Sequence, residues 1–330
     1  MPALSAQGAI LHERYRIERI IGQGGYGCIY LAEDLRLSGR YCAVKEVAYD
    51  VSLPPELLRE SREQFQREAT VLARLDHPNL PKVSDYFSIE ERDYLVMDYV
   101  PGDDLRTLVS KAAQKGEFLD EEEVLDWAQQ IGSALAYLHS QETPIVHRDI
   151  KPSNLKLTPN GIVKLVDFGL VKLLAPGEVT ITILQGQGTA IYTPLEQYGG
   201  DSLHTDRRAD IYAFGATLYH LLTNQPPVNV RDRFLDPESL PNPRAINPAI
   251  SPRVADAILW AMELHPDDRP ADVTQLMKAL TGESTTTLRN GTPGSLARHV
   301  VRIGEIERRL IAVAASLGFL TLLLTLLRNL

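Results

Sequence analysis

Four short segments of the chain carry residue types that bind phosphates and divalent cations and that move protons. In chain order they are a glycine-rich segment (Gly22–Gly27), a lysine two residues after an alanine (Ala43–Lys45), a charged cluster (His147–Asn154) and an Asp-Phe-Gly triplet (Asp167–Gly169). Glycine lets a backbone approach a phosphate, carboxylate and amide oxygens suit Mg²⁺, and a carboxylate accepts protons. Each segment alone is a weak signal, because such short matches also arise by chance.

The order and spacing of these segments remove that ambiguity. Lys45 follows the glycine segment after about twenty residues, and Asn154 and then Asp167 follow Asp149 at the spacing typical of kinases. On these motifs the chain resembles a eukaryotic-like (Hanks-type) serine/threonine protein kinase of the bacterial membrane-anchored style. The resemblance implies an α+β, bilobal protein kinase fold, with a small antiparallel β-sheet lobe plus one helix and a larger, mostly helical lobe.

The resemblance also assigns roles to the charged cluster. It implies that Asp149 accepts or orients the proton of a substrate hydroxyl and that Lys151 lies near the γ-phosphate of ATP. Asn154 and Asp167 would hold Mg²⁺ through their oxygens. Together with Lys45, these residues predict an enzyme that transfers the γ-phosphate of ATP to Ser and Thr hydroxyls of protein substrates.

The predicted nucleotide site draws mainly on the small lobe. Glycines in the first segment are expected to bring the backbone close to the phosphates, while Ala43 and Lys45 lie on one strand face, toward adenine and the α- and β-phosphates. The full predicted set is Ile21, Gly22, Gly24, Gly27, Ile29, Ala43, Lys45, Glu68, Asp98, Val100, Asn154 and Asp167.

A lysine in this position needs an acidic partner. By similarity to the family, Glu68 is the predicted partner of Lys45, with Glu63 and Glu60 as less favoured neighbours. A solvated position on its helix is the alternative for Glu68.

The adenine pocket contains one departure from the family pattern. Met97 resembles the gatekeeper, and the backbone of Asp98 to Val100 resembles the hinge that binds adenine. Lys156, however, stands where an aliphatic side chain normally lies under the adenine ring. Its methylene stem could pack there with the amine outward, or else nucleotide affinity would fall.

The segment 170–196 resembles an activation loop. Arg148, beside the catalytic aspartate, implies a cationic pocket that a phosphate on this loop could fill. Thr180 or Thr182 is the predicted site of autophosphorylation, because Thr189 resembles a threonine that contacts the catalytic aspartate. Activity without phosphorylation is the alternative.

Four further residues are expected to hold the large lobe together. Glu196, in a Pro-Leu-Glu sequence that replaces the usual Ala-Pro-Glu, is expected to pair with Arg269. Asp210 resembles the residue that braces the backbone beside Asp149, and His147 is expected to pack against Phe168 rather than act as a base.

The elements that must position these residues follow from periodicity. Alternating apolar residues predict strands over 15–21, 28–34, 40–47, 83–89 and 94–99, and helical spacing predicts a helix over 54–74. Further helices are predicted over 119–140, 205–222, 253–264 and 271–280, with an irregular proline-rich stretch over 226–252. The predicted organisation is a lead-in (1–14), a kinase domain (15–280; small lobe about 15–100, large lobe about 101–280), a linker and basic juxtamembrane segment (281–309) and a transmembrane helix (310–327).

The C-terminal segment 310–327, LIAVAASLGFLTLLLTLL, contains no charged residue. As a helix it would extend about 27 Å, close to the hydrocarbon thickness of a bilayer. Arginines are more numerous before this segment (Arg298, Arg302, Arg308 and Arg309) than after it (Arg328), which favours a single-pass cell-membrane protein with a cytoplasmic kinase domain. The alternative is a buried docking helix, although such a helix normally carries a polar face.

Composition excludes some partners. The formal net charge of −9 argues against a phosphate-backbone binder, so no nucleic acid partner is expected. The two cysteines, Cys28 and Cys42, lack metal-ligand spacing and are interpreted as buried small residues, with a redox-sensitive pair as the alternative. A homodimer is left open.

Two other functions compete with the active kinase. A membrane-tethered pseudokinase or scaffold would keep the fold, but such proteins usually lose one of the residues at positions 45, 149, 154 or 167, and all four are present here. A small-molecule kinase would lack the protein-docking features around 188–196, which are recognisable here.

Overall fold

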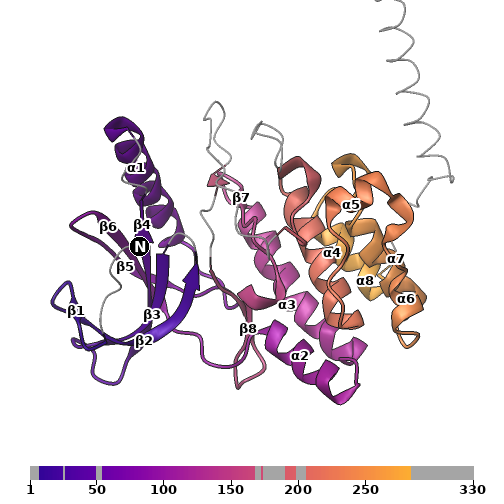
Figure 1. The fold of residues 1–330 in the computed structure, drawn as a ribbon, viewed down its shortest axis with the longest axis horizontal. Helices are drawn as coiled ribbons and strands as arrows, with labels where there is room; N and C mark the ends of the chain where they lie inside the picture. Colours follow the sequence, from indigo (N-terminus) through magenta and orange to yellow (C-terminus); the bar gives the residue numbers. More distant parts are fainter. Residues whose placement is uncertain are drawn as a thin grey trace, which may run out of the picture. The chain divides into compact units, whose positions relative to one another are not determined.

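The computed structural model describes residues 7–24, 27–49, 54–167, 172–173, 190–197 and 206–283 (Figure 1). The chain divides into two compact units, Met1–Ser284 and Thr285–Leu330. The second unit lies outside the described residues, and so does the predicted membrane helix at 310–327. Within the described ranges, no helix is both long and apolar enough to cross a bilayer.

The small lobe is a six-stranded antiparallel sheet with the strand order β1-β2-β3-β4-β6-β5. Burial alternates strictly along β3, because successive side chains point to opposite faces of a sheet. The predicted antiparallel lobe is therefore observed, with one addition: β1 lies within the stretch 1–14, which was predicted to be only a lead-in. The strands are β1 (Ile10–Leu11), β2 (Tyr15–Gly24), β3 (Gly27–Asp34), β4 (Tyr41–Ala48), β5 (Val83–Ile89) and β6 (Arg92–Asp98).

The register of the sheet separates the two cysteines. Cys42 pairs with Ala32 across β3 and β4, whereas Cys28 pairs with Gln23 on the other side of β3. Both thiols are free and buried. They therefore behave as small core residues, as interpreted from the sequence, and not as a redox pair.

One helix accompanies the sheet. Helix α1 (Pro55–Leu72) begins at a proline, whose fixed φ suits the first helical turn and which needs no N–H partner there. Its buried face consists of Phe65, Glu68, Ala69 and Leu72, and the Phe65 ring contacts Tyr86 of β5 at a centroid distance of 5.7 Å. This face places Glu68 toward the interior.

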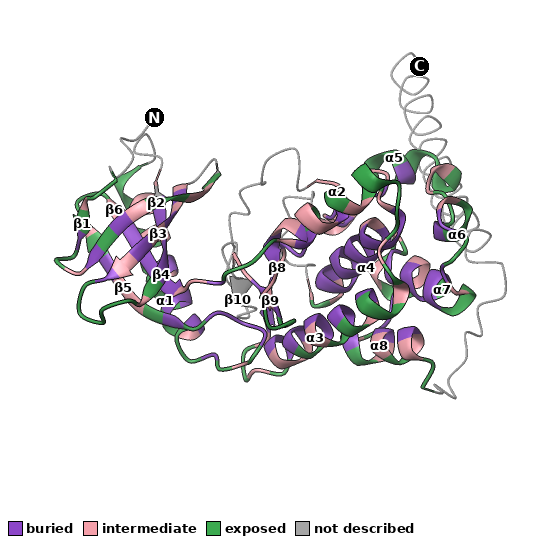
Figure 2. Cartoon of the chain, turned by 90° about the horizontal axis from the view of Figure 1, so that it is seen from below, coloured by how far each residue is buried: buried purple, intermediate pink, exposed green. Residues whose placement is uncertain are grey.

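Several helices of the large lobe begin at side-chain caps. Asp120 accepts hydrogen bonds from the backbone N–H groups of Glu122 and Glu123, and Asp104, Ser251 and Asp272 cap other helices in the same way. Figure 2 shows α4 buried along most of its length. The helices are α2 (Leu105–Lys115), α3 (Glu121–His139), α4 (Arg208–Thr223), α7 (Pro252–Ala261) and α8 (Val273–Thr281).

The stretch 226–252 is not irregular, so that prediction was wrong. It contains α5 (Val230–Leu235) and α6 (Pro243–Ile246). Asn229 and Asn242 cap these short helices, and the proline at the start of α6 promotes the helix rather than breaking it. The prolines favoured an irregular stretch, but the capping asparagines allow short helices to form there.

Two connections join the small lobe to one hairpin of the large lobe, formed by β8 (Leu155–Leu157) and β9 (Val163–Leu165). In the first, Asn79 donates to the Val163 carbonyl at 2.8 Å and accepts from the Leu165 N–H at 2.8 Å. In the second, Gly102 has a φ of +102°, and a Cβ there would lie 2.0 Å from the Leu157 carbonyl oxygen. Only glycine permits this close approach.

Candidate active site

The residues around Asp149 form one hydrogen-bonded cluster. Asp149 is 4% exposed, and its Oδ2 accepts from Lys151 Nζ at 2.9 Å and from Asn154 Nδ2 at 2.8 Å. The same Asn154 amide also donates to the Asp149 backbone carbonyl at 2.8 Å. The structure thus brings together three of the predicted site residues, in the short helix η1 (Pro152–Asn154) and the turn before it.

A buried carboxylate holds the backbone just before Asp149 through hydrogen bonds. Asp210 of α4 accepts from the backbone N–H groups of His147 and Arg148, both at 2.8 Å, which confirms the predicted brace. Burial alone would raise the pKa of Asp210, but its hydrogen bond and electrostatic interaction with His139, together with His147 and the Arg148 N–H, outweigh burial and the pKa is lowered. His139 was missed in the sequence, since its role depends on how α3 packs on α4. The predicted contact of His147 with Phe168 lies outside the described residues.

Lys45 and Asp167 link the two lobes. Lys45 Nζ and Asp167 Oδ1 form an ion pair at 2.5 Å. Asp167 lies in the loop after β9 and has a φ of +57°, a backbone conformation that is unusual for a residue other than glycine. Burial alone would raise the pKa of Asp167, but the charge and hydrogen bond of Lys45, together with Lys151 and His147, outweigh burial and the pKa is lowered. Asp167 is therefore ionised at neutral pH, as binding of a cation requires.

The predicted pairing of Lys45 with Glu68 is not the arrangement observed. Glu68, 5% exposed, accepts a hydrogen bond from Gln64 at 3.0 Å, while Lys45 pairs with Asp167. Burial raises the pKa of Glu68 to about 7, and the nearby charges of Arg148 and Lys45 oppose that rise. Glu68 is thus an interior residue near Lys45, and the alternative of a solvated helix position is excluded.

The oxygens of Asn154 and Asp167 fit a Mg²⁺ ion. Asn154 uses its amide nitrogen for Asp149, which turns its carbonyl oxygen away from that carboxylate. Among the described residues, no group of three or more His, Cys, Asp or Glu side chains could hold a metal by itself. Mg²⁺ typically binds one or two carboxylates together with substrate phosphates and waters, so a site of this limited size suits a nucleotide-bound ion.

The glycines of the first segment differ in why they are needed. A Cβ on Gly27, whose φ is +152°, would lie 1.9 Å from the Glu46 carbonyl oxygen, whereas one on Gly22 would meet Ile29 at an ordinary 3.4 Å. Gly27 is therefore required by the close approach of β3 to β4, rather than by phosphates alone as predicted. Gly24, which is paired with Gly27, closes the hairpin.

The predicted adenine pocket is apolar on its small-lobe side. Ala43, Met97 and Val100 are each at most 8% exposed, and Ile21 and Ile29 pack against the same core cluster. The Asp98 side chain accepts from Arg40 at 3.1 Å, so the part of Asp98 that could face adenine is its backbone.

Lys156 lies directly beside the lobe connection. Its backbone bridges to Asp104, and the residue is half-buried. Lys111 chiefly, and Lys156 to a smaller extent, lower the pKa of the exposed Asp103. The Lys156 amine therefore lies near enough to Asp103 to affect its charge, and the packing of its stem under adenine stays a prediction.

Arg148 carries buried donors. Its Nε and Nη2 atoms are buried and have no hydrogen bond to any described residue, and burial lowers the pKa of the guanidinium. Arg148 also has a φ of +67°. The predicted phosphosites Thr180 and Thr182 lie outside the described residues, so their relation to Arg148 stays a prediction.

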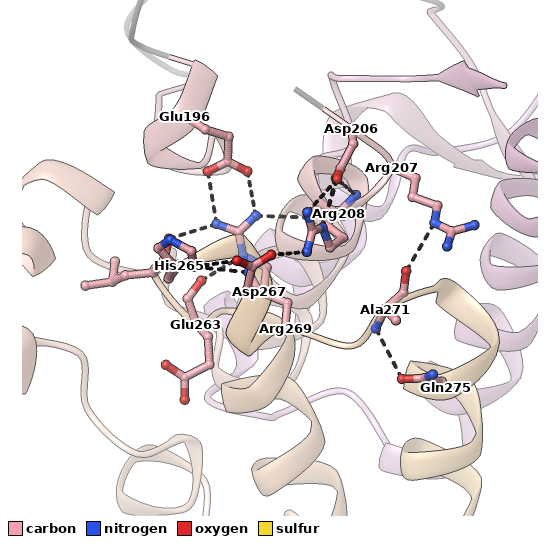
Figure 3. Close-up of polar contacts among 11 residues, drawn as sticks. Glu196, Asp206, Arg207, Arg208, Glu263, His265, Asp267, Arg269, Ala271 and Gln275 are labelled. Carbon is pink, nitrogen blue, oxygen red and sulfur yellow. Dashed lines mark hydrogen bonds and ion pairs between the residues drawn. The ribbon is translucent and has the colours of Figure 1, made fainter. Parts of the chain in front are cut away.

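A buried ion pair fixes the end of the predicted activation loop. Arg269 donates to both carboxylate oxygens of Glu196, at 2.6 and 3.0 Å, which confirms the predicted pair (Figure 3). It also donates to the backbone carbonyls of Arg208, Glu263 and Leu264. One guanidinium therefore ties residues 195–197 to α4 and to the loop before α8.

Known proteins share this sequence pattern. A family model described as the protein kinase domain matches residues 15–280. The chain is 34% identical over 268 residues to serine/threonine-protein kinase PrkC of Bacillus subtilis, covering 79% of this chain and 39% of that protein. It is 34% identical over 283 residues to serine/threonine-protein kinase C of Synechocystis, covering 83% of this chain and 50% of that protein. The chain thus spans half or less of the length of these relatives.

A solved structure shares the fold. The kinase domain of PknI from Mycobacterium tuberculosis is 27% identical, with a TM-score of 0.64, and the match covers 84% of this chain and 99% of that one. The range matched by the family model, 15–280, includes both lobes, the Asp149 cluster and the Lys45–Asp167 pair. We conclude that the chain belongs to the protein kinase family, with relatives named as bacterial serine/threonine kinases.

Proposed function

We propose that this chain transfers the γ-phosphate of ATP to Ser and Thr hydroxyls of protein substrates. The observation that carries the proposal is the joint placement of Asp149, Lys151 and Asn154 in one cluster, with Lys45 and Asp167 paired across the lobes. A scaffold without activity has no need to keep these five polar groups oriented in this way.

The chain's own residues perform three tasks in this reaction. Lys151 and Asn154 hold the Asp149 carboxylate in one orientation, from which it can align a substrate hydroxyl and take its proton. The cations of Lys45 and Lys151 compensate charge on the phosphates, and Asn154 and Asp167 offer oxygens for Mg²⁺. Bound there, Mg²⁺ would neutralise charge on the β- and γ-phosphate oxygens.

Phosphate transfer from radiolabelled ATP to a protein substrate tests the proposal directly. Lys45→Met and Asp149→Asn should each lower transfer by a factor of at least about 100, because each removes a group that acts on the reacting phosphates or hydroxyl. Lys115→Met, at an exposed position at the end of α2, is the matched control. A folded wild-type chain that transfers no phosphate would instead establish a pseudokinase.

Autophosphorylation of the activation loop is part of the proposal. The buried donors of Arg148 offer a place for a phosphate, which would satisfy them through charge-assisted hydrogen bonds. Mass spectrometry after incubation with ATP should locate phosphate on Thr180 or Thr182. Labelling of a Lys45→Met copy by an active copy would show that two molecules meet, as a homodimer requires.

We also propose that residues 310–327 anchor the chain in the cell membrane, with the kinase domain on the cytoplasmic side. The support is the eighteen-residue uncharged stretch and the arginines that precede it. The full chain should float with liposomes in a density gradient, whereas a chain ending at residue 283 should stay at the bottom. Equal flotation of the two chains would exclude this anchor.

A further inference from the structure

A surface cavity adjoins the catalytic cluster on the large lobe. Its volume is about 500 Å³, and α2 and Ser153 line it. Ser153 lies between Lys151, which contacts Asp149, and Asn154, which contacts the same carboxylate. An extended peptide advances about 3.3 Å per residue. A substrate whose hydroxyl reaches Asp149 can therefore place a residue a few positions away into this cavity.

The charges that line the cavity are not equally available. The Asp104 carboxylate accepts the Thr107 N–H at 2.8 Å as the cap of α2, and Lys111 pairs with Asp103 at 2.6 Å. Arg106 is exposed and has no hydrogen bond or ion pair with any other described residue. The cavity therefore offers one cation whose donors are open to a ligand, on a chain whose net charge is −9.

The charge of Arg106 also reaches the C-terminal part of the segment 170–196. Tyr192 and His220 of α4 are hydrogen-bonded at 2.6 Å. Burial chiefly, and Arg106 in addition, lower the pKa of His220 to about 4, so His220 is neutral at pH 7. Burial raises the pKa of Tyr192 to about 12, while Arg106 opposes the rise. The pair thus adds no negative charge beside the cavity to compete for Arg106.

We propose that Arg106 selects substrates in which an acidic group, a carboxylate or a phosphate, lies within a few residues of the phosphorylated Ser or Thr. The inference rests on the proposed protein kinase activity and adds the substrate class. The acidic group enters the cavity and pairs with the guanidinium, which binds carboxylates and phosphates through two parallel hydrogen bonds.

Peptide kinetics with the purified full chain test this. The substrates are a neutral peptide with one Thr and variants with a single Glu, phosphoserine or Arg at each nearby position. We expect the wild type to favour Glu over Arg by about three- to tenfold in kcat/KM at one or more positions, and the ratio to shrink at high salt. Comparison of Glu with phosphoserine identifies the preferred acidic group.

Two variants at one position assign the preference. Arg106→Gln should reduce the Glu-to-Arg ratio to about one, and Arg106→Glu should invert it. A glutamate fits the first turn of α2, since helix N-termini favour negative charge, so the fold should be kept. Lys115→Glu changes the same charge on the same helix outside the cavity and should leave the ratio as in the wild type.

The outcomes separate the two proposals. A wild type that phosphorylates peptides but favours Arg, or an Arg106→Glu variant that keeps the wild-type ratio, would overturn the role of Arg106 while leaving kinase activity established. A wild type that transfers phosphate neither to any peptide nor to itself would overturn both.

Discussion

At the scale of single residues, the arrangement of the site depends on which carboxylate each lysine pairs with. Lys45 pairs with Asp167, and Glu68 remains in the interior with Gln64 as its hydrogen-bond partner. A buried carboxyl group without a matching cation keeps its proton to higher pH, because burial penalises its charged form. The ionisation of Glu68 is therefore coupled to the stability of the nucleotide-free protein.

The pH dependence of stability tests this coupling. The folded-state pKa of Glu68 is about 7, above the ordinary value of 4.5, so the folded state binds more protons than the unfolded state between these values. The free energy of unfolding should therefore decrease, relative to Glu68→Gln, by about 2 to 3 kcal/mol as pH rises from 4.5 to above 7. Urea unfolding at several pH values measures it. The exposed Glu60→Gln serves as the control, and parallel curves for wild type and Glu68→Gln would contradict the prediction.

The glycine segment offers a second test at this scale. Gly27→Ala should lower the free energy of unfolding by about 2 to 4 kcal/mol, because the new Cβ would clash with the Glu46 carbonyl and the backbone would have to move. Gly22→Ala is the matched variant, since its Cβ has ordinary room, and it should cost less than about 1 kcal/mol. Similar losses of thermal stability for both would show that the hairpin tolerates Cβ atoms equally.

At the scale of elements, the large lobe depends on polar groups that join separate segments. Arg269 is the clearest example, since its side chain is fully buried and bonds to Glu196 and three backbone carbonyls. The guanidinium also lies over the Tyr212 ring at 5.0 Å. Removal of the Arg269 side chain would leave the Glu196 carboxylate and these carbonyls without their hydrogen-bond donor.

Replacement of Arg269 should therefore be severe. Arg269→Leu is expected to lower the free energy of unfolding by about 3 to 5 kcal/mol, the usual cost of breaking a buried ion pair. Arg207→Ala removes a single hydrogen bond to the Ala271 carbonyl, at 3.1 Å and on the surface, and should change stability by less than about 1 kcal/mol (Figure 3). Denaturant unfolding compares the two, and an Arg269→Leu loss as small as that of Arg207→Ala would contradict the prediction.

The sequence predicted those features that depend on local spacing or on recognisable motifs. The strands of the small lobe, the Asp149 cluster and the Glu196–Arg269 pair were all correct in this way. The partner of Lys45 was not, because it depends on how close α1 lies to the sheet, which no spacing encodes. The role of His139 was missed for the same reason, since it arises where α3 meets α4.

At the scale of the whole molecule, nucleotide binding should stabilise both lobes together against unfolding. The predicted ligands of Mg-ATP come from both, with Lys45 in the small lobe and Asn154 and Asp167 in the large one. A ligand that binds only the folded protein raises its stability by mass action.

Thermal unfolding should show this effect. Mg²⁺ with a non-hydrolysable ATP analogue, at 100 times its Kd, should raise the Tm by about 5 to 10 °C. Asp167→Asn should lose most of the shift at the same concentration, while Lys115→Met should keep it. If the Tm of the wild type does not rise even at millimolar analogue, the chain does not bind the nucleotide. Lys156 would then be expected to block adenine rather than only weaken its binding.

The two connections between the lobes restrict how that binding can move them. Asn79 and Gly102 are both held against the same β8–β9 hairpin, one by hydrogen bonds and the other by a backbone approach that excludes any side chain. Because both residues are held against one hairpin, we expect the small lobe to move chiefly by rotation about the line through them. Such a rotation would carry β2, β3 and Lys45 toward or away from Asp167 together.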